Sequence, residues 1–424
     1  MEEAFLHYLW KYKKFDFTNI QTSKRQEIII IDVGTHNENS GPDFFNSKIK
    51  INNQLWAGNV EIHLKSSFWY SHNHDIDPNY DNVILHVVWE HDAEVFRKNK
   101  SVIPVLELKN LVSESSLLQY EELFLKHSSK WINCENHFGS FGNFELQNWL
   151  ERLYFERLEE KSNFLFQNLE KRENDWEAVL FGMLAKNFGL NLNGDAFLSV
   201  ANSIPFSVVR KVAKNVSELE ALFFGQAQLL EIGIEETYFL KLKNEYEFQK
   251  RKYKLDNSAI TPMKYFRLRP DNFPSIRLAQ LAALYASKEK LFSKIIVAKR
   301  VFEIREIFNV EVSEFWNNHY SFKTESPIKP KIISNNLIDL IIINTVIPIK
   351  FCFAKHHGKN VEDEIINLIS AIKAEKNSVI NKFNELRKTT AENALQSQAL
   401  LQMKKKYCDA NLCLRCQLGH SLLH

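Results

Sequence analysis

The chain has 424 residues, of which 45% are hydrophobic and 25% are charged, and its formal net charge at pH 7 is +2. This composition is typical of a folded globular protein. It excludes a disordered chain and offers no global electrostatic argument for nucleic-acid binding. No glycine-rich phosphate-binding motif occurs, which argues against a dinucleotide-binding fold and against a P-loop nucleotide hydrolase. The length predicts two or three domains, at about 100–200 residues each.

The N-terminal residues, MEEAFLHYLWKYKKF, are acidic and amphipathic, and they lack the basic start and small-residue cleavage site of a signal peptide. The most apolar run, LIDLIIINTVIPIKFCF, contains Asp339 and Asn344. It is shorter than the roughly 18 uninterrupted apolar residues of a membrane span, and we expect a buried helix followed by a turn. The sequence therefore predicts a cytoplasmic protein without a membrane partner, and it does not indicate an oligomeric state.

The first 112 residues predict an α/β sheet domain. Residues 2–12 have apolar side chains at helical spacing, and short runs rich in Ile, Val and aromatic residues follow as predicted strands. The first of these runs, QEIIIIDVG, is typical of a buried strand, and Asn-Asn-Gln between the second and third is typical of a hairpin. The predicted strands cover residues 26–34, 44–52, 54–65, 82–92 and 101–111, with a polar insert at 66–81.

From residue 113 onward the hydrophobic period changes to 3.6, which predicts helices. We expect a helical domain at residues 113–345 and a C-terminal helical segment with a cysteine knuckle at residues 346–424. Residues 361–406 fit either one long helix or a helical pair. The predicted fold class is therefore α+β, with the N-terminal sheet domain, residues 1–112, followed by a mainly α-helical region.

A candidate catalytic and metal site lies in the sequence GPDF…NVEIHLK, where Asp43 stands in a turn and Glu61, His63 and Lys65 alternate along the next predicted strand. Alternate strand residues share one face. Hydrolysis of a phosphodiester uses a metal ion to activate water, and Mg²⁺ or Mn²⁺ prefers carboxylate ligands such as Asp43 and Glu61. Lys65 or His63 would then assist the water or the phosphate. The plain alternative is the solvated polar face of a sheet.

This segment resembles the PD-(D/E)xK nuclease superfamily. Pro42 and Asp43 correspond to the PD of its pattern, and Glu61 corresponds to the acidic residue on the following strand. The lysine of that pattern sits two residues after the acid, where this chain has His63, and Lys65 lies one step further along the same face. A literal Glu-x-Lys further along the chain follows a proline-containing strand, so we do not take it as the site.

The nuclease resemblance covers about the first 110 residues. The helix before the predicted strands carries Glu2 and Glu3, at a place where that superfamily often supplies another acid. The resemblance implies a restriction-endonuclease-like sheet, Mg²⁺ or Mn²⁺ as the cofactor and DNA or RNA as the partner.

Histidines crowd the polar insert and the strand after it. His72, His74 and His86 follow His63 closely in sequence, and Asp75 lies among them. Imidazoles at such spacing can ligate zinc, and a carboxylate can orient them from outside the ligand shell. This cluster predicts, as an alternative function, a zinc-dependent hydrolase. The competing structural interpretation is a polar loop that satisfies its own backbone groups.

Three of the five cysteines follow the pattern C-x4-C-x2-C at the C-terminus, as Cys408, Cys413 and Cys416. Three thiols at this spacing are typical of a zinc or iron–sulfur site. A fourth ligand would come from His420, Cys134 or Cys352. Resemblance to nucleases that hold an iron–sulfur cluster with one distant cysteine and a C-terminal cysteine group favours Cys134. Buried free cysteines are the structural alternative.

Nearly the whole chain resembles an uncharacterised bacterial family of unknown function, through the stretches NSGPDFFNSKI, GNVEIHLKSSFW, HNHDIDPNYDNVILHVVW, RLRPDNFPSIRLAQLA and CLRCQLG. Phe68 departs from that family, whose sequences favour aspartate there. Our leading interpretation is a metal-dependent, nuclease-like enzyme with an Asp43/Glu61 metal site. The alternatives are the zinc hydrolase and a non-catalytic nucleic-acid or protein-binding module on a degenerate nuclease-like fold.

Overall fold

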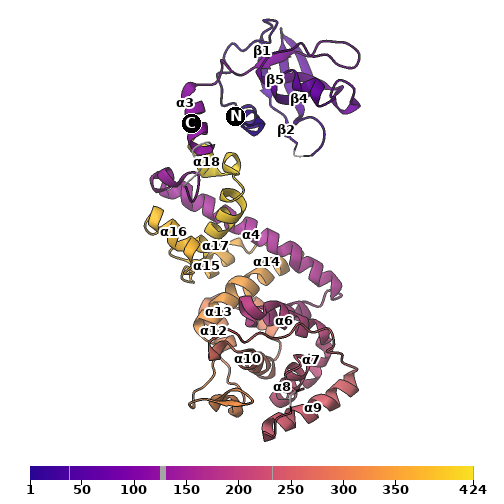
Figure 1. The fold of residues 1–424 in the computed structure, drawn as a ribbon, viewed down its shortest axis with the longest axis vertical. Helices are drawn as coiled ribbons and strands as arrows, with labels where there is room; N and C mark the ends of the chain where they lie inside the picture. The colour runs from indigo at the N-terminus through magenta and orange to yellow at the C-terminus, as the bar shows by residue number, and fades with distance from the viewer. Residues whose placement is uncertain (38, 125–129, 232, 424) are drawn as a thin grey trace. The chain divides into compact units, whose positions relative to one another are not determined.

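The protein is described by a computed structural model that covers residues 1–37, 39–124, 130–231 and 233–423 (Figure 1). The chain forms two compact units, one made of Met1–Trp149 with Met403–His424 and the other of Leu150–Gln402. The boundaries expected from the sequence were residues 112 and 345. Of the expected C-terminal segment, residues 403–424 belong to the sheet-containing unit and residues 346–402 belong to the helical unit.

A mixed sheet of six strands forms the centre of the first unit. Its strands pair in the order β1-β3-β4-β5-β6, and β2 pairs with β3. The pairs among β1 to β4 are antiparallel, whereas β5 runs parallel to β4 and to β6. The α+β class is confirmed. The strand bounds are β1 (Ile28–Asp32), β2 (Thr35–His36), β3 (Phe44–Ile51), β4 (Gln54–Lys65), β5 (Val83–Glu90) and β6 (Val105–Glu107).

The predicted hairpin between β3 and β4 is confirmed, and it sets the register of the site. Asn52 and Asn53 have φ values of 47° and 67°, which suit a two-residue turn of the type that matches strand twist. The register runs from Ile51 opposite Gln54 to Phe44 opposite Val60, with an irregularity near Phe44. Residue 43 therefore lies beside residue 61 at the far end of the hairpin.

The strand β1 is correctly located but was wrongly expected to be buried. It lies at the edge of the sheet, and Ile29 and Ile31 are 46% and 49% exposed. A short apolar run alone does not distinguish an edge strand from a central one, because periodicity reports side-chain pattern and not the number of neighbouring strands.

The core of the first unit explains where that unit ends. The helix α1 (Glu3–Tyr12) buries Phe5, Leu6 and Leu9 against the sheet. Tyr120 of α3 (Glu114–Phe124) and Leu423 near the C-terminus belong to the same apolar cluster. These contacts join segments that are distant in the sequence, which local composition does not reveal.

The polar insert forms the crossover between the parallel strands β4 and β5. It contains α2 (Phe68–Ser71) and the 3₁₀ turn η1 (Pro78–Tyr80), in agreement with the expected ordered loop with one helical turn. Trp69 and Tyr80 anchor it in a second buried cluster with residues of β5. The crossover is therefore packed onto the sheet beside β4.

The second unit is helical, in agreement with the expected helical region. Residues 361–406 form neither one helix nor a pair, since three helices, α15, α16 and α17, occupy that range. A two-stranded hairpin, β7 (His319–Ser321) with β8 (Thr324–Glu325), is also present. The remaining elements are α4 (Asn143–Lys171), which begins in the first unit, α5 (Trp176–Phe188), α6 (Leu190–Ser203), α7 (Phe206–Val212), α8 (Val216–Gln226), α9 (Thr237–Tyr253), α10 (Pro274–Ser287), α11 (Leu291–Val297), α12 (Val301–Phe308), α13 (Asn335–Ile341), α14 (Ile347–His356), α15 (Glu362–Ser370), α16 (Ser378–Leu386) and α17 (Ala394–Met403).

The most apolar segment is a continuous helical run with a turn after it at residues 357–358, in agreement with the expected buried helix followed by a turn. A π-helical segment, Ile342–Val346, joins α13 to α14 directly before Pro348. The wider turn tolerates a residue that has no amide donor. Among the described residues, Asn335–His356 is the one helix long and apolar enough to cross a membrane by length and composition, and 78% of its most apolar window is buried, as in a core helix.

Gly58 permits the close approach of β4 to the start of β5. A Cβ atom at this position would lie 2.5 Å from Ile84 Cγ2 and 2.6 Å from the carbonyl oxygen of Asn82. We expect Gly58→Ala to lower the free energy of unfolding of the first unit by about 1–3 kcal/mol, as overpacking does, in denaturant unfolding. Gly142→Ala is the control, since its added methyl group would meet only Glu145 Cβ at 4.0 Å. Equal stability of the two variants would contradict this account.

Candidate metal centre

Asp43 and Glu61 are held next to each other by two reciprocal backbone hydrogen bonds. The amide of Asp43 donates to Glu61 Oε2 at 3.2 Å, and the amide of Ile62 donates to Asp43 Oδ2 at 2.9 Å. Each carboxylate is thus bound by the backbone of the other's segment, which the hairpin register brings together. The structure places these two predicted site residues side by side.

The helix α1 adds two further titratable groups. His7 Nε2 lies 3.4 Å from Asp43 Oδ2. Burial, followed by the charge of Asp43, raises the pKa of the Glu3 carboxyl, while His7 lowers it. The acid expected from the N-terminal helix is therefore Glu3. Sequence reasoning missed His7, although its position one helical turn after Glu3 puts both on one helix face.

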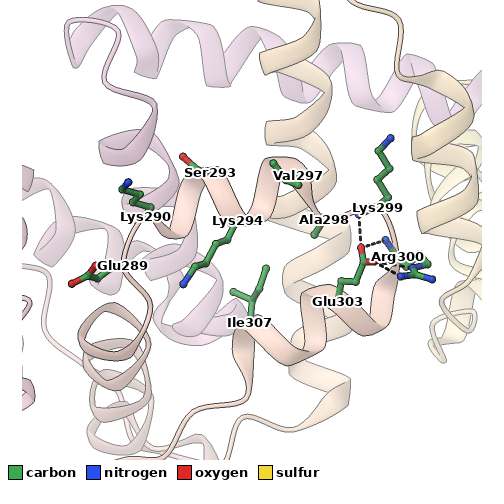
Figure 2. A pocket seen from close by; sticks show the side chains of 10 residues that line it. All are labelled: Glu289, Lys290, Ser293, Lys294, Val297, Ala298, Lys299, Arg300, Glu303 and Ile307. Carbon is green, nitrogen blue, oxygen red and sulfur yellow. Dashed lines mark hydrogen bonds and ion pairs between the residues drawn. The ribbon is translucent and has the colours of Figure 1, made fainter.

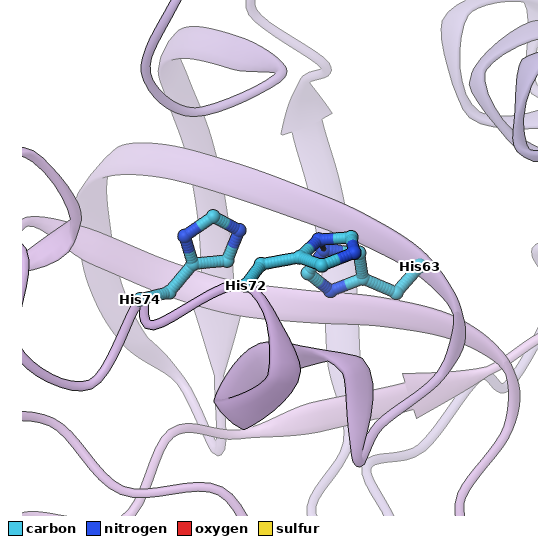
Figure 3. A group of neighbouring side chains, drawn as sticks. All are labelled: His63, His72 and His74. Carbon is cyan, nitrogen blue, oxygen red and sulfur yellow. Dashed lines mark hydrogen bonds between the residues drawn. The ribbon is translucent and has the colours of Figure 1, made fainter.

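Three histidines converge in the first unit (Figure 3). His63 comes from β4, and His72 and His74 come from the crossover that follows it. One ring nitrogen from each lies within 4.8 Å of the others, and His63 Nε2 is 3.1 Å from His72 Nδ1. Among the described residues, no other group of three or more potential metal ligands has its ligand atoms this close together.

Glu61 connects the histidines to the carboxylate pair. Its Oε1 atom lies 3.4 Å from His63 Nε2 and 3.2 Å from His74 Nε2. At a tetrahedral zinc ion with bonds of 2.0–2.2 Å to nitrogen and oxygen, neighbouring ligand atoms are about 3.3–3.6 Å apart. The observed separations are close to these values. His63, His72 and His74 therefore fit a transition-metal ion, with Glu61 against two of them.

His86 contacts His63 from outside the group of three candidate ligands. Its Nε2 atom is 2.9 Å from His63 Nδ1, and its ring is completely buried. If His63 donates its Nδ1 proton to His86, the His63 Nε2 lone pair points into the cluster, which is how an outer partner orients a metal ligand. The group of four histidines predicted from sequence thus separates into three candidate ligands and one orienting residue.

Burial keeps the imidazoles neutral, as metal ligands must be. Desolvation, followed by the neighbouring His86, lowers the pKa of His63 to about 2. Desolvation also lowers the pKa of His86 to about 3 and that of His74 to about 4. Near neutral pH these rings carry no charge and retain a lone pair for coordination. Tyr80 stacks on His74 with ring centroids 3.7 Å apart and holds it in place.

The acidic side of the site lacks a cationic partner among the described side chains. Burial, followed by the Asp43 charge, raises the pKa of Glu61 to about 9. The ion-pair contacts of Asp43 and Glu61 in the described part of the chain involve histidines. A buried carboxylate next to a second acid is costly unless it is protonated or faces a cation. A divalent ion would supply that positive charge.

Lys65 and Phe68 lie at the margin of this site. Lys65 is exposed at the end of β4, opposite Glu90 of β5, and about 13 Å along the strand from Glu61. The histidine at the position of the nuclease lysine, His63, is inside the cluster. The ring of Phe68, where related sequences favour aspartate, has its centroid 6.4 Å from that of His63.

The predicted cysteine ligands also lie in the first unit. Cys408, Cys413 and Cys416 approach Cys134, as described further below. His420 packs instead against Tyr12, with ring centroids 4.5 Å apart. Cys352 is buried in α14 of the helical unit. Of the three possible fourth ligands, the structure brings Cys134 to the C-terminal group.

A large hollow of about 950 Å³ lies in the second unit between α11 and α12 (Figure 2). Glu303, on its wall, accepts hydrogen bonds from the amides of Lys299 and Arg300 and from the Arg300 guanidinium. These groups cap the start of α12, which is a structural role. The hollow therefore does not compete with the histidine cluster as a reaction site.

The buried histidines predict an acid-sensitive fold in the metal-free protein. Unfolded histidines titrate near pH 6.5, whereas those with folded-state pKa values of about 2–4 stay neutral, so lowering the pH from 6.5 to 5 favours the unfolded chain. Each such histidine costs about 1 kcal/mol per pH unit in this window. Glu61 has a raised pKa, so between pH 6.5 and 5 its carboxyl is protonated in the folded protein and ionised in the unfolded chain. Its pH dependence therefore has the opposite sign and offsets that of about one histidine.

Denaturant unfolding between pH 7 and 5 measures this dependence. We expect His86→Asn to make the fall in stability shallower by about 1 kcal/mol per pH unit. His137→Asn, at a surface histidine whose side chain is 42% exposed, is the matched control and should leave the slope unchanged. An identical slope in His86→Asn and the unaltered protein would show that His86 is not held neutral.

The family is shown by a match over most of the chain. Residues 3–378 match the family model described as a protein of unknown function, DUF2851. Neither a curated protein nor a solved structure matches the chain. The resemblance to an uncharacterised family of unknown function is confirmed over these residues, and the quoted stretch CLRCQLG lies outside them. The chain belongs to the DUF2851 family of proteins of unknown function.

Proposed function

We propose that the first unit is a metal-dependent hydrolase whose metal ion is bound by His63, His72 and His74. The observation that carries the proposal is the convergence of one nitrogen from each ring within 4.8 Å, next to a buried carboxylate. Three imidazoles with an oxygen ligand suit zinc, and catalytic zinc sites combine three protein ligands with a position for water. Zinc is therefore the expected metal.

Glu61 is the proposed general base. A zinc ion held by these imidazoles would supply a water that is acidic enough to act as a nucleophile near neutral pH. The Glu61 carboxylate, 3.2 Å from His74 Nε2 and 3.4 Å from His63 Nε2, would accept a proton beside that ion. Burial has already raised its pKa, which favours proton uptake, while a nearby cation would bring that pKa back toward neutrality.

The surrounding residues position these groups. The amide of Asp43 fixes one oxygen of Glu61, and His86 fixes the ring of His63. His72 is the exposed member of the ligand group, so substrate would approach from its side. His7 holds Asp43 from α1.

Phosphodiester hydrolysis is the second candidate, and a specific observation favours it. Asp43 and Glu61 are side by side at the end of a hairpin, with Glu3 near Asp43, as expected for a Mg²⁺ or Mn²⁺ site that acts on DNA or RNA. Lys65 contributes little support, because it lies far along β4 from Glu61. In this alternative the carboxylates bind the ion and His72 is dispensable.

Metal binding is tested first, with His72→Asn as the variant. His72 is exposed, so its replacement should leave the fold intact. We expect zinc affinity at this centre to fall by more than the roughly 10–100-fold that loss of an outer partner costs. Calorimetric zinc titration measures this, and the cobalt(II) spectrum distinguishes nitrogen and oxygen ligands from thiolates. His137→Asn should bind zinc normally. An unchanged zinc affinity in His72→Asn would contradict the three-histidine centre.

Hydrolysis is tested with Glu61→Gln, which keeps the size of the side chain and removes its basicity. The unaltered protein, loaded with Zn²⁺ or Mn²⁺, should hydrolyse at least one member of a panel of DNA, RNA and small phosphodiesters and esters. We expect Glu61→Gln to slow that reaction by about 10²–10⁴-fold, as for loss of a general base.

The metal and variant dependence then separates the two candidates. Loss of activity in His72→Asn with Zn²⁺ supports the histidine centre, whereas activity that needs Mn²⁺ and Asp43 but tolerates His72→Asn supports the nuclease alternative. A folded, metal-loaded protein that hydrolyses no member of the panel would contradict both hydrolytic functions. The non-catalytic binding module would then be the remaining interpretation.

A further inference from the structure

Four cysteines from distant parts of the chain gather in the first unit. Cys134 lies just before the 3₁₀ segment η2 (Glu135–Ser140). The side-chain amide of the preceding Asn133 donates to Cys413 Sγ at 3.3 Å. Burial, followed by the neighbouring Cys416 and Cys413 thiols, raises the pKa of Cys134 to about 12. The residue before η2 therefore lies against the C-terminal cysteines.

The fourth thiol completes the group. Cys408 ends the π-helical segment η6 (Lys404–Cys408). Its pKa is raised by burial and then by each of the other three thiols, Cys134, Cys416 and Cys413. All four cysteines are free of disulfides. Each thiol is thus close enough to others of the group to affect their ionisation.

The C-x2-C part of this group is a tightly closed loop. Cys413 begins the 3₁₀ turn η7 (Cys413–Arg415), and the amide of Cys416 donates to the Cys413 carbonyl at 3.1 Å. The short helix α18 (Gln417–Ser421) folds back against this turn. A Cβ atom at Gly419 would lie 2.2 Å from the carbonyl oxygen of Cys413, so the loop closes only around a glycine.

Hydrogen-bond donors are directed at the sulfurs of this loop. The backbone amides of Gly419 and Leu418 bind the Cys416 thiol and counteract the effect of burial on its pKa, which is about 11. Asn133 does the same for Cys413. Thiol sulfur is a weak acceptor, whereas a charged acceptor forms hydrogen bonds roughly twice as strong. Such donors therefore suit thiolates better than thiols.

Positive charge also accompanies the group. Lys130 lowers the pKa of Cys134, and Lys404 lowers that of Cys408, although burial outweighs both. Four thiolates around a dication carry a net negative charge, which nearby ammonium groups would partly balance. Packing alone does not require four neighbouring thiols with donors and ammonium groups around them.

We propose that Cys134, Cys408, Cys413 and Cys416 are the four thiolate ligands of a structural metal centre, either an iron–sulfur cluster or a zinc ion. Soft thiolates select both of these centres. Each thiol would release its proton to solvent as it binds the metal. The site is separate in ligand type from the histidine centre and does not depend on the proposed hydrolysis.

The two forms of the centre differ in the spacing that they require of the sulfurs. A single zinc ion with Zn–S bonds of about 2.3 Å brings its sulfurs to about 3.8 Å from one another. Thiolates that each bind a different iron of one cluster are expected to be farther apart than those on one ion.

A metal centre here would fasten the C-terminal segment to the sheet-containing unit. The C-terminal cysteines lie beyond residue 402, where the chain leaves the helical unit, while Cys134 lies in the N-terminal part. The leucines near the C-terminus already pack on the core of the first unit. The centre would add a covalent connection to that apolar contact.

The test uses the full chain, produced and purified without oxygen, followed by iron, sulfide and zinc analysis and visible absorption. We expect about four iron and four sulfide per chain with broad visible absorption, or one zinc without it. Cys413→Ser and Cys134→Ser should each lower the metal content at least tenfold. Cys352→Ala, a buried cysteine in α14, is the matched control and should keep it.

Two further measurements guard against misfolded variants. Removing the metal from the unaltered protein with a chelator should lower its melting temperature, and reconstitution should restore it. His72→Asn should keep the thiolate-bound metal while losing the nitrogen-bound one. Iron or zinc lost on Cys134→Ser supports the proposal and identifies the centre. Folded protein that holds neither metal, before and after reconstitution, would overturn it, as would a metal content that Cys134→Ser leaves unchanged.

Discussion

The burial of the Glu61 carboxylate on β4 is the constraint on which the first unit depends. The side chain is 5% exposed, next to a second acid, and no lysine or arginine among the described residues pairs with it. An unpaired carboxylate in such a place costs several kcal/mol unless it is hydrogen-bonded, protonated or matched by a cation. The backbone amide of Asp43 donates to one of its oxygens, and the imidazoles of His63 and His74 lie within 3.4 Å of the other. These contacts gather electron-pair donors, which is what a metal ion needs.

The sheet topology explains how so few elements build this site. The strand β4 carries both Glu61 and His63, and the crossover that makes β5 parallel to it carries His72 and His74. Because β5 pairs with β4 directly, His86 arrives opposite Glu61 and beneath His63. One strand, its crossover and the next strand thus supply the candidate ligands and their orienting partner.

The sequence predicted the strand face correctly but not the depth of its residues. Alternation placed Glu61, His63 and Lys65 on one face, yet only the first two are buried, because periodicity does not report where a strand leaves the core. His7 was missed for a related reason, since its contact with Asp43 joins a helix to a hairpin that follows it by 36 residues in sequence. The apolar core that unites the first unit is built from long-range contacts, which local composition does not reveal. Counting the ligands of the three-cysteine motif left His420, Cys134 and Cys352 open as the fourth, and only the resemblance to iron–sulfur nucleases favoured Cys134.

The helix α1 relates the two candidate centres physically. Its Glu3 and His7 interact with Asp43, while its Tyr8 and Tyr12 pack against His420 of α18, four residues after Cys416. A thiolate centre that holds α18 in place would therefore also hold α1 in place. The groups of α1 that contact Asp43 would be fixed with it. The two ligand sets differ in softness, nitrogen and oxygen in one and sulfur in the other, so each selects its own metal. A filled thiolate centre would then stabilise the helix whose Glu3 and His7 interact with Asp43.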